Sequence, residues 1–386
     1  MKISSLICEY NPFHNGHRYM LDTMRRNGSD YIIACMSGNF TQRGDFAVFD
    51  KYSRTKTALQ NGIDLVIELP VTYACATAEK FAFGGVYLLN ALGCVDTIAF
   101  GSECGKISSL EKTADLLCSD ALSDKIRYYL SLGQTFAKAR ENAVSEISQS
   151  SADLLRSPNN ILAVEYLKAL RRMSAPISPE TVRRVGSAHD SLTVSESIAS
   201  ATLIRRMMNE SNPDFQNYIP KTEMSPIHQL SRLENALLYR LRMMSREDFS
   251  HLPDISEGLE NRLFSAVRSA CSVSEMLSLA KTKRYPLSRL RRIVLYAFLG
   301  ITQADSDILP PYIKILGFNQ NGKTILRTLR NTAKLPVVMR FSDVKKLSPD
   351  ARRLYALETR CDDIYALSGE SPEPCGKNLT ANPIII

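Results

Sequence analysis

The sequence predicts an α/β fold: a Rossmann-like, doubly wound parallel sheet followed by a mostly helical C-terminal part. Three observations lead to this fold class. Four short apolar segments in the first hundred residues alternate with segments of helical periodicity, which is the pattern of βαβ units. Each apolar segment runs into polar or Gly-rich residues, as expected where parallel strands end at a ligand-binding edge. Beyond residue 220, helical periodicity dominates the chain.

The predicted strands are short and apolar, and each is followed by residues that break a strand. They comprise 3–8 (ISSLIC), 31–36 (YIIACM), 64–69 (DLVIEL) and 95–100 (VDTIAF). The residues that end them are, in the same order, Asn11-Pro12, Ser37-Gly38-Asn39, Pro70 and Gly101. Helices are predicted between the strands, over about 15–26, 51–61 and 77–92.

The rest of the chain is predicted to be mainly helical. Residues 107–172 carry helical periodicity, 181–185 (TVRRV) read as a strand, and 195–209 as a loop that leads into a short helix. Breaks around Asn212-Pro213 and Pro220 divide the chain into an α/β domain, 1–215, and a mostly helical domain, 216–386. The elements predicted in the second domain are helices near 230–243, 257–270 and 286–299 and a strand at 337–341.

The composition is that of an ordinary globular protein, with 44% hydrophobic and 23% charged residues among 386. The most apolar stretch, 81–95, is too short to span a bilayer, and the N-terminus has no apolar segment of signal-peptide length. We therefore expect a cytoplasmic protein without a membrane partner. Nine cysteines without a CxxC pair and only five histidines favour reduced thiols and no metal centre held by the protein.

The net charge of +8 is confined to the second half of the chain. Residues 1–220 carry 23 basic and 23 acidic side chains, whereas residues 221–386 carry 25 and 17. This asymmetry is typical of a surface that meets a polyanion. The densest basic segment, 281–292, opens the predicted helix at 286–299, and its Arg residues are predicted to face phosphates with Tyr285 as a stacking residue. A solvated helix start is the alternative.

The motif with the clearest chemistry is His14-Asn15-Gly16-His17, directly after the first strand and at the start of a helix. Two His at i and i+3 lie on one face of the first turn. Gly16 leaves room for a phosphate to approach the backbone, and a helix N-terminus attracts anions. The motif predicts a site that stabilises charge on an α-phosphate and a departing pyrophosphate.

A second motif, Ser200-Ala201-Thr202-Leu203-Ile204-Arg205, opens the short helix after the sheet. Together the two motifs resemble the HxGH and ISSTxxR signatures of the nucleotidylyltransferase superfamily. The Ser and Thr hydroxyls and the Arg205 guanidinium are predicted to bind the β- and γ-phosphates. Taken alone, Ser200 and Thr202 would be read as an ordinary N-cap. His14, His17, Thr202 and Arg205 are the predicted catalytic residues.

Longer segments narrow the resemblance. CEYNPFHNGHRYML, MSGNFTQRGDFAVFDKYSRTKTAL, GIDLVIELP, SPNNILAVEYLKAL and KTKRYPLSRLRRIVLYAFLGI are similar to the bacterial tRNA(Met) cytidine acetate ligase family. The resemblance implies a nucleotidylyltransferase-like, ATP-binding catalytic domain and a basic, helical tRNA-binding domain. It implies that acetate and ATP form acetyl-adenylate, with Mg2+ accompanying ATP. The acetyl group would then pass to N4 of cytidine 34 in elongator tRNA(Met), giving N4-acetylcytidine, AMP and pyrophosphate. No protein partner is implied.

The resemblance also implies a nucleotide site, carried onto matching positions. These positions are Ile7, Cys8, Glu9, Tyr10, Asn11, Pro12, Phe13, His14, Asn15, Gly16, His17, Arg18, Tyr19, Met20, Gly101, Asn160, Arg183, Arg184 and Ser200. Cys8 stands where the family usually has Val or Ile, which changes the size little.

Several single residues have two interpretations. Asn11 is predicted to fix its loop or a phosphate oxygen. Gly101 with Ser102 and Glu103 is expected against adenine or ribose, and Glu103 has the alternative of binding a helix N-terminus. Asn160 is a nucleotide residue by resemblance and an N-cap otherwise.

Three further positions are candidates from their place in the chain. Lys51 and Arg43 are candidate phosphate ligands, with a surface lysine as the alternative for Lys51. Ser37-Gly38-Asn39 is where acetate or the acceptor is expected, because it ends the second strand. Glu68 and Asp64 flank a buried strand and are read as structural.

Two other functions compete with the RNA-modifying ligase. One is a small-molecule adenylyltransferase that acts on a mononucleotide or phosphopantetheine, which would leave the basic second half unexplained. The other is a non-catalytic RNA-binding protein, against which the intact His14, His17, Thr202 and Arg205 argue.

Overall fold

The computed structural model describes residues 1–134, 136–184, 198–221, 225–256 and 258–386. Val185 and residues 195–197, which belong to predicted elements, lie outside these ranges. The core of the fold is one mostly parallel sheet with the strand order β5-β4-β1-β2-β3-β6-β7, to which β8 adds by pairing with β6. The strands are β1 (Ile3–Cys8), β2 (Tyr31–Ser37), β3 (Leu65–Leu69), β4 (Thr97–Ser102), β5 (Ser178–Arg183), β6 (Ile313–Phe318), β7 (Val337–Val338) and β8 (Ile384–Ile385).

The sequence places the first four strands to within two residues, while the fifth begins three residues earlier than predicted. The predicted α/β class is confirmed. The sheet also crosses the predicted boundary at residue 215. β6 pairs with β3, and this is an antiparallel pair in an otherwise parallel sheet. The two predicted domains therefore share one sheet.

Helices alternate with the strands in the first part of the chain. In chain order they are α1 (Asn15–Arg26), α2 (Lys51–Gln60), α3 (Val71–Ala74), α4 (Ala78–Leu92), α5 (Ile107–Leu117), α6 (Asp120–Ser131), α7 (Phe136–Ile147), α8 (Gln149–Leu154), α9 (Pro158–Arg172) and α10 (Ala201–Asn209). Apolar side chains of α1 and α2 pack on one face of the sheet, and those of α4 and α9 pack on the other. This is the doubly wound arrangement.

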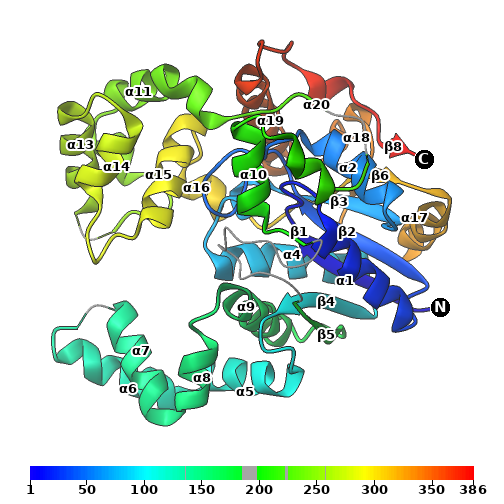
Figure 1. Ribbon diagram of the computed structural model, residues 1–386, viewed down its shortest axis with the longest axis horizontal. Helices are drawn as coiled ribbons and strands as arrows, with labels where there is room; N and C mark the ends of the chain where they lie inside the picture. The colour runs from blue at the N-terminus through cyan, green and yellow to red at the C-terminus, as the bar shows by residue number, and fades with distance from the viewer. Residues whose placement is uncertain (135, 185–197, 222–224, 257) are drawn as a thin grey trace.

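The C-terminal part supplies a helical cluster and a return to the sheet. Its elements are the 3-10 turns η1 (Pro213–Asn217), η2 (Leu230–Leu233) and η3 (Ala366–Ser368), and the helices α11 (Glu234–Met243), α12 (Arg246–Ser250), α13 (Leu259–Ser269), α14 (Val273–Ala280), α15 (Leu287–Leu299), α16 (Gln303–Ser306), α17 (Gln320–Thr332), α18 (Phe341–Val344), α19 (Pro349–Tyr365) and α20 (Lys377–Thr380). Figure 1 shows α11, α13, α14 and α15 side by side at the upper left, and α6 to α8 below them.

Two cores hold the parts together. The largest lies between the sheet and the layer of α4, α9 and α17. The second joins the C-terminal helices to α19 and also takes in Phe40 and Phe46, which come from the long loop after β2. This loop therefore lies between the sheet and the C-terminal helices.

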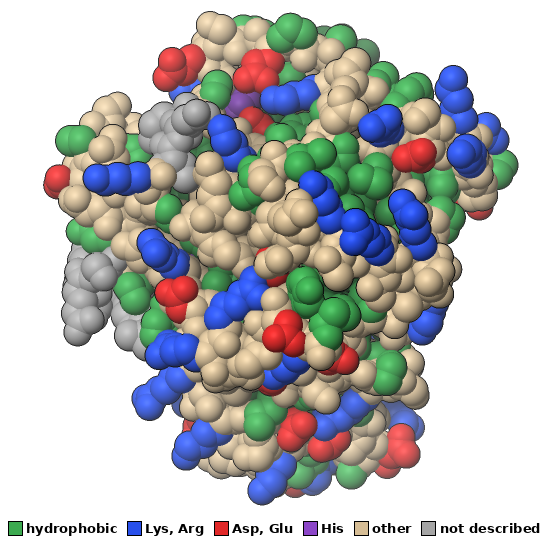
Figure 2. All heavy atoms as spheres, turned by 90° about the vertical axis from the view of Figure 1, so that its right-hand side faces the viewer, with side chains coloured by type: hydrophobic (Ala, Val, Ile, Leu, Met, Phe, Trp, Pro, Cys, Tyr) green, Lys and Arg blue, Asp and Glu red, His purple; other side chains and the backbone are tan. Residues whose placement is uncertain are grey.

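On the face that Figure 2 shows, Lys and Arg side chains are distributed over the whole surface with Asp and Glu among them. Within the described residues, no helix combines the length and the apolar character needed to cross a membrane.

Candidate active site

A cavity of about 410 Å³ opens at the carboxyl ends of β1, β4 and β5, where the strand order changes direction. Most residues of the predicted site line it. They are Ile7, Cys8, Glu9, Tyr10, Asn11, His14, Gly16, His17, Tyr19, Met20, Gly101, Arg183, Arg184, Ser200, Thr202 and Arg205. The cavity thus brings together the two sequence motifs, which are almost 190 residues apart in the chain.

Five positions implied by the resemblance do not line the cavity. These are Pro12, Phe13, Asn15, Arg18 and Asn160. Phe13 belongs to the core under α1, and the backbone of Asn15 donates to the carbonyl of Tyr218. They shape the loop around the motif.

The two histidines form a capping box at the N-terminus of α1, with His14 as the N-cap residue. The backbone N–H of Gly16 donates to Nδ1 of His14 (3.1 Å), and the backbone N–H of His14 donates to Nδ1 of His17 (3.2 Å). A ring nitrogen that accepts an N–H carries no proton, so each neutral ring holds its proton on Nε2. The two rings stack with centroids 3.7 Å apart. The motif therefore presents a pair of neutral Nε2–H donors.

The environment of His17 keeps it neutral. Burial lowers the pKa of its imidazole well below the usual range, and His14 and Arg184 lower it further. The structure gives a further reason for glycine at position 16. A Cβ at Gly16 would lie 2.9 Å from Cε1 of His14, so the missing side chain makes room for the capping ring.

The second motif is tied to the first by Arg205. Ser200 is the N-cap of α10 and accepts from the backbone N–H of Leu203 (3.1 Å). Arg205 donates through Nη2 to the Thr202 hydroxyl (3.3 Å) and through Nη1 to the carbonyl of Asn11 (2.7 Å). The side chain of Asn11 accepts from the backbone N–H of Val48, which supports its predicted role of fixing the loop.

The loop after β4 is held by two residues that cap each other's backbone. Glu103 accepts from the backbone N–H groups of Asn159 (3.2 Å) and Asn160 (2.8 Å) at the start of α9. In return, Oδ1 of Asn160 accepts from the backbone N–H groups of Glu103 and Cys104. The helix-capping interpretation of Glu103 is thus the correct one. Asn160 positions the loop, and its neighbour Asn159 lines the cavity.

Some residues that line the cavity were not predicted from the sequence. The loop after β2 contributes Thr41, Gln42 and Asp45 beside the predicted Arg43, and α9 contributes Tyr166. The polar loop was visible in the sequence, but nothing in it indicated which side chains turn toward the site.

Arg291 of α15 also lines the cavity, although the sequence assigned it to an outer RNA-facing surface. The loop after β2 reaches α15 at Gly44, whose φ is +77°. A Cβ there would lie 2.6 Å from the backbone N of Arg292, so only glycine allows this approach. The contact fixes the helix of the basic part against the catalytic cavity.

Three members of the basic segment 281–292 differ from the prediction of phosphate-facing and base-stacking groups. Arg292 is buried and pairs with Asp254 (3.0 Å), and Arg289 donates to the carbonyl of Asp254 (2.8 Å). Tyr285 is buried in the C-terminal core, so it does not stack on a base. These side chains hold the helical cluster together.

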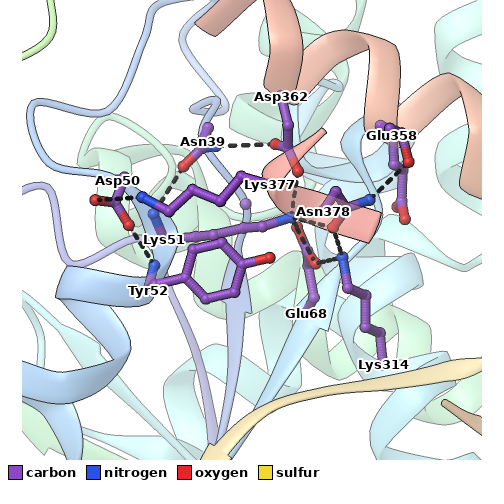
Figure 3. Close-up of polar contacts among 12 residues, drawn as sticks. Asn39, Asp50, Lys51, Tyr52, Glu68, Lys314, Glu358, Asp362, Lys377 and Asn378 are labelled. Carbon is purple, nitrogen blue, oxygen red and sulfur yellow. Dashed lines mark hydrogen bonds and ion pairs between the residues drawn. The ribbon is translucent and has the colours of Figure 1, made fainter. Parts of the chain in front are cut away.

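Lys51 is not a phosphate ligand. Its side chain is 0% exposed, and its ammonium group lies 2.7 Å from Oε1 of Glu68 and 2.6 Å from Oδ2 of Asp362. Figure 3 shows this buried charge cluster, in which Lys314 binds the second oxygen of Glu68 (2.7 Å). Glu68 is structural, as the sequence predicted.

The segment Ser37-Gly38-Asn39 does not line the cavity either. Arg54 donates to the carbonyls of Ser37 and Gly38, and the side chain of Asn39 joins the backbone of Lys51 (2.7 Å) to Asp362 (2.9 Å). These two carbonyls and the Asn39 side chain are thus used by the scaffold, and after β2 the chain reaches the cavity only at Thr41.

The cavity is electropositive. Its acidic side chains among the described residues are Glu9 and Asp45, against the guanidinium groups of Arg43, Arg183, Arg184, Arg205 and Arg291. With the neutral His pair at a helix N-terminus, this arrangement suits a polyphosphate. Within the described residues, no three His, Cys, Asp or Glu side chains gather as metal ligands.

Comparison with known proteins gives the family. The family described as HIGH Nucleotidyl Transferase matches residues 1–378. The tRNA(Met) cytidine acetate ligases of Thermoanaerobacter sp. (strain X514) and Acetivibrio thermocellus are 40% and 37% identical to this chain, and each alignment covers 100% of both proteins.

Solved structures agree over the same length. Thermotoga maritima TmcAL superimposes with a TM-score of 0.94 in its apo form I, at 32% identity, and with 0.91 in the form II bound with alpha-thio ATP, at 31% identity. Both comparisons cover 100% of each chain. The resemblance predicted from the motifs is confirmed, and the chain belongs to the tRNA(Met) cytidine acetate ligase family of HIGH nucleotidyl transferases.

Proposed function

We propose that this protein activates acetate with ATP to form acetyl-adenylate and transfers the acetyl group to N4 of cytidine 34 in elongator tRNA(Met). The observation that carries the proposal is the meeting of His14, His17, Thr202 and Arg205 at one electropositive cavity. The full-length similarity to enzymes named for this reaction supports it.

In the first step, a carboxylate oxygen of acetate attacks the α-phosphorus of ATP and pyrophosphate leaves. The step needs alignment of the reactants and stabilisation of the charge that develops on phosphate oxygens. The Nε2–H groups of His14 and His17 are suited to the α-phosphate, because each can donate a hydrogen bond to a phosphate oxygen. Arg205 and Thr202 are suited to the β- and γ-phosphates, since α10 brings both to the same cavity and the guanidinium contacts the hydroxyl.

Magnesium is part of the proposal as the companion of ATP. Glu9 and Asp45 come from different elements, and the protein offers no cage of carboxylates among the described residues. A site without such a cage fits a cation that would be carried mainly by phosphate oxygens and waters, as Mg2+ usually is in nucleotide sites. When bound, the ion would neutralise charge on the polyphosphate.

The tRNA is proposed to approach from the side of α15. Arg291 reaches the cavity from the basic C-terminal part, and a small substrate would not require a cation from there. For the same reason, the alternative of a small-molecule adenylyltransferase is the weaker one. A tRNA acceptor also implies a reaction in the cytoplasm.

The test is acetate-dependent exchange of labelled pyrophosphate into ATP by the purified protein, with propionate and nicotinate mononucleotide as comparison substrates. We expect exchange with acetate and weaker exchange with propionate, because one methylene is worth about 1–3 kcal/mol in a fitted pocket. Turnover of the mononucleotide without exchange on acetate would contradict the proposal and favour the small-molecule enzyme.

A further inference from the structure

Glu9 lines the cavity together with the two histidines. Glu9 directly follows β1, which is paired with strands on both sides, and the two histidines follow within eight residues. Its Oε1 accepts the backbone N–H of Gln42 at 2.7 Å, and its own carbonyl accepts from Nη1 of Arg54 at 2.6 Å. The backbone and one carboxyl oxygen are thus fixed, and Oε2 receives no hydrogen bond from the described residues.

The second step of the proposed reaction requires a proton acceptor. The exocyclic amine of cytosine is a weak nucleophile because its lone pair is delocalised into the ring. It must lose one of its two protons as the bond to the acetyl carbon forms. A positioned base contributes about 10²–10⁴-fold to such a step.

We propose that Glu9 accepts this proton from cytidine N4; the inference rests on the proposed function. The bond that forms joins N4 to the acetyl carbonyl carbon, and the bond that breaks joins that carbon to the phosphate oxygen of AMP. AMP leaves with the electron pair, and Oε2 of Glu9 takes the N4 proton and later releases it to water.

Four other titratable groups of the described cavity wall are poor bases for this step, and Asp45 is the main competitor of Glu9. His14 and His17 use Nδ1 to accept backbone N–H groups, and their Nε2 atoms carry protons. Burial raises the pKa of the Cys8 thiol and of the Tyr166 hydroxyl well above the usual values, so both stay protonated. Asp45 resembles Glu9 in two respects: removal from solvent raises the pKa of its carboxyl, and its Oδ1 accepts from the backbone N–H of Phe46 (2.8 Å). It differs in being more exposed than Glu9.

The surroundings of Glu9 fit the role in two ways. Burial raises the pKa of its carboxyl, which brings it nearer to neutral pH, while the N–H of Gln42 and the guanidinium groups of Arg205, Arg54 and Arg43 oppose the rise. A carboxylate is also the usual partner of a cytosine N4–H group. The same residue would therefore select cytosine and receive its proton.

The experiment uses the full-length Glu9→Gln protein, in which the amide oxygen can still accept from Gln42. Chemically prepared acetyl-adenylate and tRNA(Met) transcript are supplied, so the transfer step is followed without the activation step. We expect the transfer rate to fall about 100-fold or more, and acetate-dependent pyrophosphate exchange to fall by a much smaller factor. In the wild-type protein, the transfer rate should increase as the pH rises through the raised pKa of Glu9. The Glu9→Gln variant should not show this increase.

Asp45→Asn removes the other carboxyl of the cavity and is the matched comparison. Equal losses of transfer in the two variants, or equal losses of exchange and transfer in Glu9→Gln, would assign Glu9 a general electrostatic or structural role and overturn the inference. If the wild-type protein forms no N4-acetylcytidine, the proposed function itself fails. Normal wild-type transfer with an unaffected Glu9→Gln variant removes only the role of Glu9.

Discussion

The catalytic cavity and the buried cluster around Lys51 are both rich in charged side chains, and both lie where the C-terminal part meets the sheet. In the cluster, the two lysines face opposite charges: Lys51 and Lys314 share Glu68, and Lys51 also binds Asp362. In the cavity, basic groups outnumber acidic ones and line open space. The first arrangement joins distant segments, and the second leaves its positive charge for an anionic ligand.

The difference shows that residue type alone does not mark a binding site. A lysine at the start of α2, directly after a polar loop, has the sequence context of a phosphate ligand. Its neighbours decide otherwise, because two carboxylates neutralise it away from solvent. If this holds, substitutions in the cluster should lower the stability of the fold, and substitutions in the cavity should lower the activity.

The largest effect is expected from Lys51→Met. The substitution leaves Glu68 and Asp362 buried with less compensating charge, which typically costs about 3–5 kcal/mol. Chemical denaturation should show this loss in the free energy of unfolding. Lys323→Met, at an exposed position of α17, serves as the control and should change stability by less than about 0.5 kcal/mol. Similar stabilities of the two variants would show that the cluster does not hold the parts together.

His17→Ala should reduce catalysis while leaving the fold intact. It removes one Nε2–H donor from the proposed α-phosphate site, and loss of one such donor typically lowers a rate about 10²–10³-fold. Pyrophosphate exchange measures the effect, and thermal unfolding checks the fold. His251→Ala, an exposed histidine of the C-terminal part, is the control. Exchange at the wild-type rate in His17→Ala would remove the histidine from the reaction.

Arg291→Ala is expected to act on the tRNA. Losing a charge-assisted hydrogen bond to phosphate costs about 1.5–3 kcal/mol, so the KM for tRNA should rise about tenfold or more. The slope of log K for tRNA binding against log salt concentration should also decrease by about one, as expected for the loss of one phosphate contact. Lys283→Ala, exposed in the same basic segment, is the control. A rise in the KM for ATP with an unchanged KM for tRNA would place Arg291 on the polyphosphate.

The sequence predicted the features that depend on residues close together in the chain, and it missed those that depend on contacts between distant segments. The histidine pair and Arg205 act within single helical turns, so their spacing already indicated a shared site. Lys51 was misassigned because Asp362 is 311 positions away in the chain. β6 was missed because its antiparallel pairing with β3 joins the ends of a long connection, which no local period reveals. Likewise, the approach of Gly44 to α15 depends on tertiary packing alone.

The smallest effect is a change in pH dependence at the edge of the cluster. Tyr312 donates to Oε2 of Glu358 (2.7 Å), and burial, followed by the charge of Glu68, raises the pKa of Glu358 to about 7. A carboxyl whose pKa is higher in the folded state binds a proton there that the unfolded chain releases near pH 4.5. Its contribution to stability is therefore complete below about pH 4.5 and is lost as pH rises through about 7.

Glu358→Gln isolates this contribution, because the amide does not titrate. The difference in free energy of unfolding, variant minus wild type, should increase between about pH 4.5 and 7 and stay constant above that range. Denaturation curves at closely spaced pH values measure it. A difference that does not change with pH would mean that Glu358 is ionised in the folded protein throughout this range. Lys51 and Lys314 would then stabilise three carboxylates of the cluster, and the contrast with the cavity would be sharper still.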